Sequence, residues 1–398
     1  MDTSDDRPGA TSGGAAGDPP TPGSDAPRAR PSPEAPPLRF ALVGAGANIA
    51  EQHLRAIAET PGAELVAVCD VDAGKAARLI ERTGAPFYAD LAELLREVRP
   101  DVVSVLTPHP FHAPVAEAAL AAGAHVLVEK PLAVTTSEAD RMVTAAERAG
   151  KVLAVSFQQR FSPLTERLRA WVRSGELGDV VRVQVLEPWL RTAAYFRAAS
   201  WRATWRGEGG GVLLNQAPHA LDLLTHLLGL PARVTGLTRT TRHAIECEDT
   251  AHALLEWEDG AVGYFASCTT EPETGRRVEL VCDRAKVTVS GDRLQRTDFE
   301  PGLREHALTD PEPFGRPRLV ERPPETLAAG ATHAAVYRDL VAAVREGRPP
   351  RCDGASGRMS LELANAIALS SWTGRPVDLP LDRGAYDAAL AERRGAGG

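Results

Sequence analysis

The sequence predicts an α/β protein in which a doubly wound parallel sheet is followed by an α+β domain with an open, mainly antiparallel sheet. Three observations lead to this fold class. The chain has 398 residues, and a domain has about 150 residues on average. Over residues 38–157 short apolar runs alternate with helical segments, as in a parallel sheet covered by helices on both faces. Within residues 158–385 several segments alternate apolar and polar residues, as antiparallel strands with one buried face do.

The two chain ends are expected to lie outside these domains. Residues 1–37 are rich in Pro and Gly and hold hardly any large apolar side chain, so they cannot bury enough surface to offset the entropy cost of ordering. We expect a disordered tail there and a flexible C-terminus at 386–398. The Pro-rich stretch after Arg28 and Arg30 is unlike the apolar part of a secretion signal. No apolar run approaches the roughly 18 residues of a membrane span, so a cytoplasmic protein is predicted.

The first domain is expected to alternate strands with helices. The helix after the first strand carries Ala50, Leu54 and Ile57 on one side. The next helix should begin after Asp72, because an Asp side chain is a good N-cap, and should end at Gly84. The apolar runs that predict the strands are 39–43, 65–68, 102–106, 126–128 and 152–155.

The second domain is expected to open with a helix that starts at Ser162-Pro163 and ends near Gly175. Antiparallel strands follow. Residues 300–330, dense in Pro, Gly and Arg, are interpreted as a long loop, and helices over 333–346 and 358–373 complete the domain. The apolar positions of the alternating segments are Val181, Val183, Val185, Ala251, Ala253, Leu255, Trp257, Val262, Tyr264, Ala266, Val278, Leu280, Val287 and Val289.

The composition argues against several function classes. The chain has 53 acidic and 45 basic residues and a net charge of −8, whereas a nucleic-acid partner requires a basic face. The five Cys form no C-x-x-C pair, which argues against a disulfide framework and a cysteine zinc site. His109 and His112 lack a third ligand at a convincing spacing, so no metal is expected.

A glycine-rich turn follows the first strand, where residues 44–50 read G-A-G-A-N-I-A. Such glycines let backbone amides approach a pyrophosphate at a helix N-terminus. Ile49 replaces the third Gly of the motif G-x-G-x-x-G, so a tight turn alone is the alternative interpretation. Asp70 ends the second strand, where a carboxylate binds ribose hydroxyls and repels the 2'-phosphate of NADP. We therefore expect NAD, bound by Gly44, Gly46, Asn48, Ile49 and Asp70.

A lysine follows the strand at 126–128, in the sequence Glu129-Lys130-Pro131. This is the edge at which open α/β sheets place their ligands. Only four of the 45 basic residues are Lys, and a desolvated Lys, unlike Arg, can lose its proton near neutral pH. The alternative is an ordinary surface pair of Glu129 and Lys130. We favour a functional role for Lys130.

Three consecutive glycines, 209–211, begin a second unusual segment and bring a backbone close to another group. On a helix, Asn215, His219 and Asp222 would point from one face. Pro218 interrupts such a helix unless it lies in the first turn, so the placement of Asn215 is less certain than that of His219 and Asp222. A polar stripe on a partly buried helix explains the same spacing.

Aromatic and guanidinium groups are concentrated between residues 189 and 206, although only 5% of the chain is aromatic. Flat apolar faces and forked donors suit a polyhydroxylated ring or a phosphate, and interdomain packing explains half of them equally well. The residues are Trp189, Arg191, Tyr195, Trp201, Arg202, Trp205 and Arg206. We expect the substrate to contact Asn215, Asp222, Arg160 and Trp205.

Together these motifs resemble those of the Gfo/Idh/MocA family of oxidoreductases. The resemblance covers residues 38–381 and rests on G-A-G-A-N-I-A, C-D, T-P-H-P-F-H, E-K-P, G-G-G-V-L-L-N-Q-A-P-H-A-L-D and T-G-R-P-V-D-L-P. It implies an N-terminal Rossmann domain, NAD(P)-dependent chemistry on sugars or cyclitols, and an open sheet that often mediates dimers or tetramers.

The resemblance also assigns roles by position. The family's catalytic lysine falls on Lys130 and its catalytic histidine on His219. Many members have Asp where this chain has Asn215, and the N-Q variant resembles the branch that contains nucleotide-sugar 3-dehydrogenases. The motifs T-P-H-P and E-K-P add further expected cofactor contacts, at Thr107, His109, Glu129 and Lys130.

The resulting hypothesis is the reversible oxidation of a secondary alcohol, with Lys130 accepting the hydroxyl proton and His219 bonding to the same oxygen. Two alternatives stay open. One is an NAD-dependent glycoside hydrolase that oxidises its sugar transiently. The other is a non-catalytic NAD or sugar sensor with the same fold, as the family's corepressor relatives are.

Overall fold

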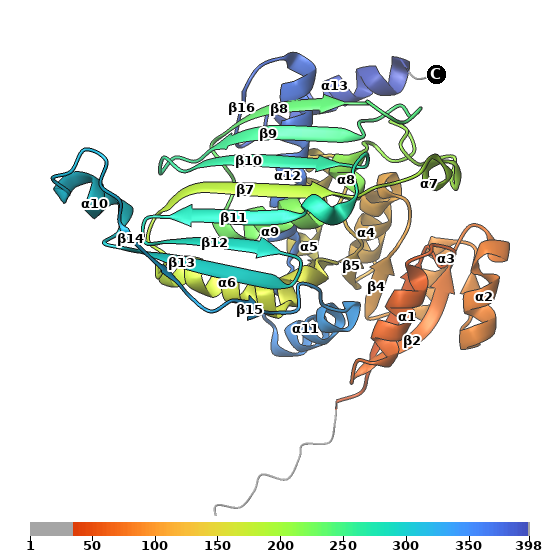
Figure 1. The fold of residues 1–398 in the computed structure, drawn as a ribbon. Coiled ribbons are helices and arrows are strands. Elements are labelled where there is room, and N and C mark those ends of the chain that lie inside the picture. The colour runs from red at the N-terminus through yellow and green to blue at the C-terminus, as the bar shows by residue number, and fades with distance from the viewer. Residues whose placement is uncertain (1–34, 397–398) are drawn as a thin grey trace, which may run out of the picture. The chain divides into compact units, whose positions relative to one another are not determined.

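The computed structural model of the protein describes residues 35–396, so most of the expected N-terminal tail lies outside the described residues. Two sheets organise the described part. In Figure 1 the larger sheet faces the viewer, and the smaller one lies beside and behind it. Within residues 35–396 no helix has the length and apolar character needed to cross a membrane.

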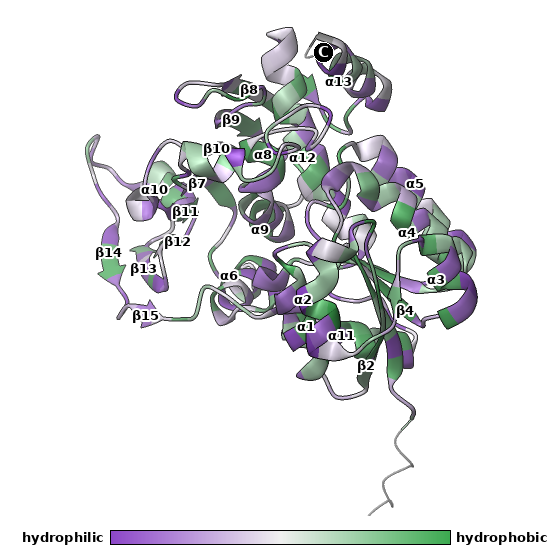
Figure 2. Cartoon of the chain, turned by 90° about the vertical axis from the view of Figure 1, so that its right-hand side faces the viewer, coloured by the Kyte–Doolittle hydropathy of each residue, from purple (hydrophilic) through white to green (hydrophobic). Residues whose placement is uncertain are grey.

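The first sheet is parallel, with the strand order β3-β2-β1-β4-β5-β6. Its central strands are fully buried because helices cover both faces, and Figure 2 shows the strands mainly in green among helices that mix green with purple. The two-residue strand β3 was not predicted, because its residues are only half-buried. The strands are β1 Leu38–Val43, β2 Ala63–Cys69, β3 Phe87–Tyr88, β4 Val102–Val105, β5 His125–Val128 and β6 Leu153–Val155.

Capping residues set the helix ends of this domain as predicted. The Asp72 side chain accepts from Gly74 N and Lys75 N, and Gly84 ends the helix in a left-handed conformation. Thr135 and Glu138 form a capping box at the start of α5. The helices are α1 Ala50–Ala58, α2 Ala73–Thr83, α3 Leu91–Val98, η1 His109–Phe111, α4 His112–Ala121, α5 Thr136–Ala149 and η2 Gln158–Phe161.

The second sheet is mixed but mainly antiparallel, with β7 and β10 as its parallel pair. The strand order is β14-β13-β12-β11-β7-β10-β9-β8-β16, with β15 on β13. The strands are β7 Val180–Pro188, β8 Arg233–Arg239, β9 Thr250–Glu256, β10 Val262–Cys268, β11 Arg277–Cys282, β12 Ala285–Ser290, β13 Arg293–Glu300, β14 Arg318–Glu321, β15 Glu325–Thr326 and β16 Val377–Asp378.

Helices cover one face of this sheet, and the other face is open (Figure 1). The long helix α12 packs on β8, and α9 packs on both α12 and β7. The predicted helix at 163–174 is confirmed as α6, with the Ser162 side chain as its N-cap. The helices are α6 Pro163–Ser174, α7 Ala193–Arg197, α8 Val212–Asn215, α9 Pro218–Leu228, η3 Glu273–Gly275, α10 Leu303–Thr309, α11 His333–Glu346, α12 Gly354–Thr373 and α13 Arg383–Ala396.

One predicted strand has the opposite face in the core. Val262, Tyr264 and Ala266 were expected to point inward, but Val262 is 49% exposed and the buried positions of β10 are Gly263, Phe265, Ser267 and the last residue, Cys268. Position 263 on the inner face is a glycine because a Cβ there would lie within 3.1 Å of the Trp257 ring. A glycine on the inner face therefore makes room for this large apolar ring.

Two stretches expected to be irregular contain regular structure. Residues 300–330 include the helix α10 and the strands β14 and β15, and both strands pair with β13 at one edge of the sheet. The segment from 386, expected to be flexible, belongs to α13 up to Ala396. Tyr386 and Leu390 on this helix are buried, so its apolar face holds it against the domain.

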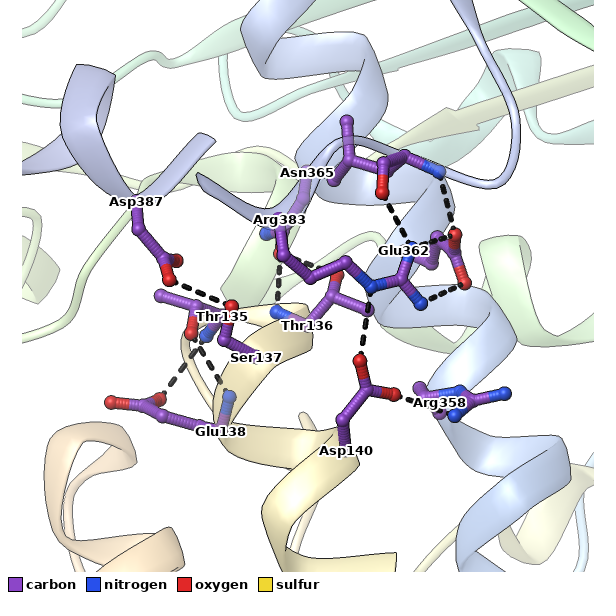
Figure 3. Close-up of polar contacts among 11 residues, drawn as sticks. Thr135, Thr136, Ser137, Glu138, Asp140, Arg358, Glu362, Asn365, Arg383 and Asp387 are labelled. Carbon is purple, nitrogen blue, oxygen red and sulfur yellow. Dashed lines mark hydrogen bonds and ion pairs between the residues drawn. The ribbon is translucent and has the colours of Figure 1, made fainter. Parts of the chain in front are cut away.

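Elements from the far C-terminal part cover the first domain. Helix α11 packs against α1 on the first sheet, and Tyr337 and Leu340 of α11 are fully buried there. On the other face, α12 and α13 meet α5 through the polar network in Figure 3. Asn365 Oδ1 accepts from both the backbone N–H and the hydroxyl of Thr136, each at 2.9 Å, while its Nδ2 donates to Val134 O.

Candidate active site

The glycine turn lies between β1 and α1, and its glycines are required by close contacts. Gly44 has a φ of +92°, and a Cβ there would lie 2.7 Å from the Leu106 carbonyl carbon and from Thr107 N. A Cβ on Gly46 would lie 2.6 Å from Lys75 Cβ. No side chain fits at either position, so the backbone of this turn lies directly against the end of β4.

Asp70 fixes the shape of this turn from the end of β2. Its Oδ2 accepts from Gly46 N at 2.8 Å, and its Oδ1 accepts from Asp72 N at 2.9 Å. The residue is only partly buried, Asn48 is exposed and Ile49 is half-buried. The three side chains therefore stay accessible at the N-terminal end of α1, where a pyrophosphate would be expected.

The loop after β4 supplies the next expected contacts, Thr107 and His109. The Thr107 hydroxyl is buried and has no hydrogen-bond partner within the described residues. His109 Nδ1 lies 3.2 Å from the Glu208 carbonyl oxygen, and burial holds its pKa well below the usual value. His112 lies between the carbonyl oxygens of Thr107 and Pro131, at 2.7 and 2.8 Å. This ring ties the loop after β4 to the loop after β5.

Lys130 follows β5 and reaches toward the second domain. Its Nζ donates to the Asn215 carbonyl oxygen at 2.9 Å. Burial lowers the pKa of the amine, the charges of Arg202 and Arg191 lower it further, and the charge of Glu129 opposes them. An amine in this setting is more readily deprotonated than a surface lysine, as a proton acceptor requires.

Glu129 is buried between two histidines from distant helices. Its Oε1 lies 2.9 Å from His53 Nε2 on α1 and 3.4 Å from His333 Nε2 on α11. Burial by itself would raise the pKa of Glu129, but hydrogen bonds from His333 and His53 outweigh it and hold the pKa well below the usual value. His53 Nδ1 also bonds to the Tyr337 hydroxyl, at 2.9 Å.

Within residues 35–396, His53, Glu129 and His333 form the one cluster of His, Cys, Asp and Glu side chains close enough together to hold a metal ion. Direct hydrogen bonds already satisfy the atoms that would bind an ion. All five Cys are buried and free.

Asn215 and His219 lie on two different helices. Pro218 occupies the first position of α9, where its missing N–H costs no helical bond, so α8 ends at Asn215 and α9 carries His219 and Asp222. His219 Nδ1 has no partner within the described part of the chain. Burial and then the Lys130 charge lower its pKa to about 3, so the imidazole is neutral.

Lys130, Asn215 and His219 share one feature that their neighbours lack. Each is partly exposed, while the residues directly before and after it are buried. Lys130 bonds to Asn215, and the Lys130 charge acts on His219. The structure therefore places Lys130 and His219, the two residues expected to be catalytic, near Asn215, which was expected to contact the substrate.

Sequence reasoning missed Glu208. Its side chain is almost completely buried and accepts hydrogen bonds from Asn215 Nδ2 and from Ala203 N. Burial raises the pKa of this carboxyl group. An acidic residue directly before three glycines was a signal, since a charged side chain next to such a close backbone contact needs a partner.

The three glycines approach another part of the same chain. A Cβ on Gly211 would lie 1.9 Å from the Glu248 carbonyl oxygen. The Glu248 side chain accepts from Gly211 N at 2.9 Å and from Leu213 N at 3.1 Å, and burial raises its pKa to about 7. These contacts fix the segment that presents Asn215.

Three residues expected to bind substrate have other partners. The Arg160 guanidinium and the Asp222 carboxylate form an ion pair at 2.6 Å, with side chains 1% and 2% exposed. Each satisfies the buried charge of the other. Trp205 packs edge-on against Trp372, with ring centroids 5.6 Å apart. The structure thus gives Arg160, Asp222 and Trp205 supporting positions behind the segment that carries Asn215 and His219.

The residues present fit a dinucleotide. The glycine turn admits no side chain, Asp70 is accessible at the end of β2, and the buried Thr107 hydroxyl lacks a partner. A doubly wound sheet with this turn and an acidic residue at the end of the second strand defines a protein of the dinucleotide-binding class.

Comparison with known proteins identifies the family. Residues 38–157 match the model of an oxidoreductase family with an NAD-binding Rossmann fold, and residues 165–288 match that of the GFO/IDH/MocA C-terminal domain. The chain belongs to the Gfo/Idh/MocA family. The predicted fold class and the assignment to the oxidoreductases are confirmed.

Several relatives are enzymes named for sugars. The chain is 38% identical to D-glucoside 3-dehydrogenase of Escherichia coli strain K12 over 56% of its length, but the match spans only 62% of that relative. It is 28% identical to D-apiose dehydrogenase of Paraburkholderia graminis, over 86% of this chain and 90% of that one. A crystal structure of the WlbA dehydrogenase from Chromobacterium violaceum with NADH and UDP-GlcNAcA has a TM-score of 0.77 and 33% identity, covering 89% of this chain and 99% of that chain.

Proposed function

We propose that the protein catalyses the reversible oxidation of a secondary alcohol of a sugar, sugar derivative or cyclitol, with NAD as the hydride carrier. The contact of Lys130 Nζ with the Asn215 carbonyl oxygen, 2.9 Å long, supports this proposal most directly. It joins the lysine of the first domain to the segment of the second domain that carries His219. A substrate bound there would meet an amine and an imidazole at once.

In this mechanism Lys130 accepts the hydroxyl proton while the C–H bond of the same carbon breaks. Bound NAD would supply the acceptor for the hydride that leaves that carbon. His219 is neutral because its pKa is lowered to about 3, so its imidazole hydrogen-bonds the reacting oxygen without placing a second positive charge beside Lys130. Asn215 holds the amine through its carbonyl group. Positioned acid–base groups of this kind contribute about 10²–10⁴-fold to a rate.

The chain's own residues support NAD over NADP. Gly44, Gly46, Asn48 and Ile49 would hold the pyrophosphate, and Thr107 and His109 would border the nicotinamide half. Asp70 would accept hydrogen bonds from the ribose hydroxyls while keeping its bonds to Gly46 N and Asp72 N. A 2'-phosphate would place two negative groups side by side there. Glu129, expected to contribute to cofactor binding, would do so indirectly by holding Lys130, because its side chain accepts a hydrogen bond from Lys130 N at 3.2 Å.

The substrate class is inferred from relatives whose names specify D-glucoside and D-apiose. A homodimer or homotetramer and a cytoplasmic location stay predictions. The two alternative functions, an NAD-dependent glycoside hydrolase and a non-catalytic sensor, predict different results when the protein is tested on sugars. Bound NAD with glycoside cleavage and no net NADH would indicate the hydrolase, and the absence of turnover on a broad panel would indicate a sensor.

The test follows the absorbance of reduced nicotinamide while purified protein is mixed with inositols, aldoses, sugar phosphates and nucleotide sugars. With a substrate found, Lys130→Met should lose about 10²-fold or more of kcat and keep its affinity for NAD. Lys286→Met is the matched control, because Lys286 lies on β12 in the second sheet. Near-normal turnover of Lys130→Met would refute the assignment.

A further inference from the structure

A guanidinium group lies close to the proposed reaction centre. Arg202 Nη1 donates to the Tyr195 hydroxyl, which donates to Asn215 Oδ1 at 3.2 Å. The Asn215 backbone carbonyl accepts from Lys130 Nζ. Two residues therefore connect the Arg202 side chain to the Lys130 amine.

Aromatic faces orient this guanidinium. Its central carbon lies 4.2 Å from the centre of the Tyr195 ring and 4.8 Å from that of Trp201. The Trp201 ring in turn lies 6.3 Å from the His109 ring, on the loop after β4. Stacking on two rings fixes the plane of the guanidinium and leaves its edge for hydrogen bonds.

The positive charge of Arg202 has no matching carboxylate. Within residues 35–396 no Asp or Glu forms an ion pair with it, although its charge lowers the pKa of the buried Glu208, and its Nε is buried without a hydrogen-bond partner. Glu129 is bound by His53 and His333. Glu208 is bound by an amide and a backbone N–H.

A second arginine adds to this charge. Arg191 lies 5.2 Å from the Tyr195 ring, and its contact with Glu273 is long, at 3.9 Å. The charges of Arg202 and Arg191 both act on the Lys130 amine, where they favour its neutral form. The charges of Glu129 and Glu208 act on the same amine in the opposite direction, but within the described residues neither carboxylate forms an ion pair with Arg202, so its guanidinium keeps donors for an anion.

We infer that the substrate carries a negatively charged group, a carboxylate or a phosphate, which Arg202 binds while the reacting hydroxyl meets Lys130. This inference rests on the proposed function. Guanidinium groups bind both kinds of anion through paired N–H donors, and the unpartnered Nε provides one of them. An anion that accepts from this donor gains a charge-assisted hydrogen bond that a neutral sugar makes less strongly.

The test compares D-glucose with D-glucuronate and D-glucose 6-phosphate. One measurement is kcat/KM with NAD, and the other is calorimetric binding to the NADH-loaded protein, which needs no turnover. We expect at least one acidic sugar to bind tenfold or more tightly than glucose, and the two acidic sugars distinguish a carboxylate from a phosphate. Arg202→Met should remove this preference and leave the binding of NADH nearly unchanged.

Two further variants control for structure. Arg197→Met removes an exposed guanidinium from α7 in the same segment and should keep the preference. Arg202→Lys keeps the charge without the fork and should retain part of it. Equal or tighter binding of glucose by the wild type, or an unchanged preference in Arg202→Met, overturns the inference. Oxidation of glucose that depends on Lys130 would in that case leave the proposed function standing.

Discussion

Replacing Gly44 with Ala tests whether the glycine turn is set by contact with β4. The residue has a φ of +92°, and its added Cβ would lie 2.7 Å from two backbone atoms, the Leu106 carbonyl carbon and Thr107 N. Backbone atoms cannot rotate away. The positive φ costs about 1 kcal/mol, and overpacking adds about 1–3 kcal/mol. We therefore expect Gly44→Ala to lower the free energy of unfolding by about 2–4 kcal/mol.

Gly84→Ala separates the two contributions. Gly84 has a φ of +62°, and no atom lies within 4 Å of a Cβ placed there, so only the backbone cost of about 1 kcal/mol applies. Urea unfolding measures the difference in free energy of unfolding between the two variants. Titration with NAD measures whether the altered turn still binds the dinucleotide. Gly44→Ala should also weaken NAD binding, whereas Gly84→Ala should not. Equal losses of stability in the two variants, with unchanged NAD binding in both, would refute the reasoning.

Three further predictions concern buried polar groups. Asn365→Ala leaves the Thr136 donors unpaired and should lower the free energy of unfolding by about 2–4 kcal/mol in urea, since each lost partner costs about 1–3 kcal/mol. Glu129→Gln removes a negative charge that raises the pKa of Lys130, so the acid limb of the kcat/KM profile should move to lower pH. His226→Asn should reduce the loss of stability in acid, which thermal melting between pH 7 and 5 measures.

The sign of the His226 effect follows from its two protonation equilibria. Burial and four nearby arginines lower its pKa from 6.5 to about 3 in the folded protein. Between these values the unfolded chain binds the proton and the folded chain does not, so stability falls as the pH falls below 6.5. Most of the unfolded imidazole is protonated at pH 5 while the folded one is not, so the loss should already be measurable there. A variant as acid-sensitive as the wild type contradicts this account.

The other two predictions have their own controls. Ser137→Ala removes a single side-chain bond to Asp387 in the same network and should cost less than Asn365→Ala. An unchanged acid limb in Glu129→Gln would mean that the Glu129 charge does not reach the Lys130 amine.

The strands of the first domain other than β3 could be predicted because both of their faces are buried, which gives continuous apolar runs. The buried face of β10 could not be predicted from the sequence pattern. Its inward positions include Gly263 and Ser267, while the outward Val262 carries the apolar signal. Periodicity registers hydrophobicity, but a small residue that makes room for the Trp257 ring contributes none.

In the candidate site, too, some features could be predicted from the sequence and others could not. Lys130 and His219 could be found because they follow a strand or a Gly-rich segment within a few residues. The hydrogen-bond partners of Glu129 could not be found from the sequence, since His53 and His333 are 76 and 204 positions away from it. Arg160 and Asp222 were expected to face the substrate, yet they pair with each other, because an isolated buried charge is costly.

The position of α11 changes what the first domain needs in order to fold. The sequence places the end of that domain at residue 157, yet α11 buries Tyr337 and Leu340 against α1 and the first sheet. The helix also brings His333 to Glu129, directly before Lys130. A chain cut after residue 157 would expose this apolar face and lose one of the two histidines that hold the Glu129 carboxylate. The lysine proposed to accept the proton is thus positioned by residues from both ends of the described chain, and its chemistry depends on the packing of the two domains as one unit.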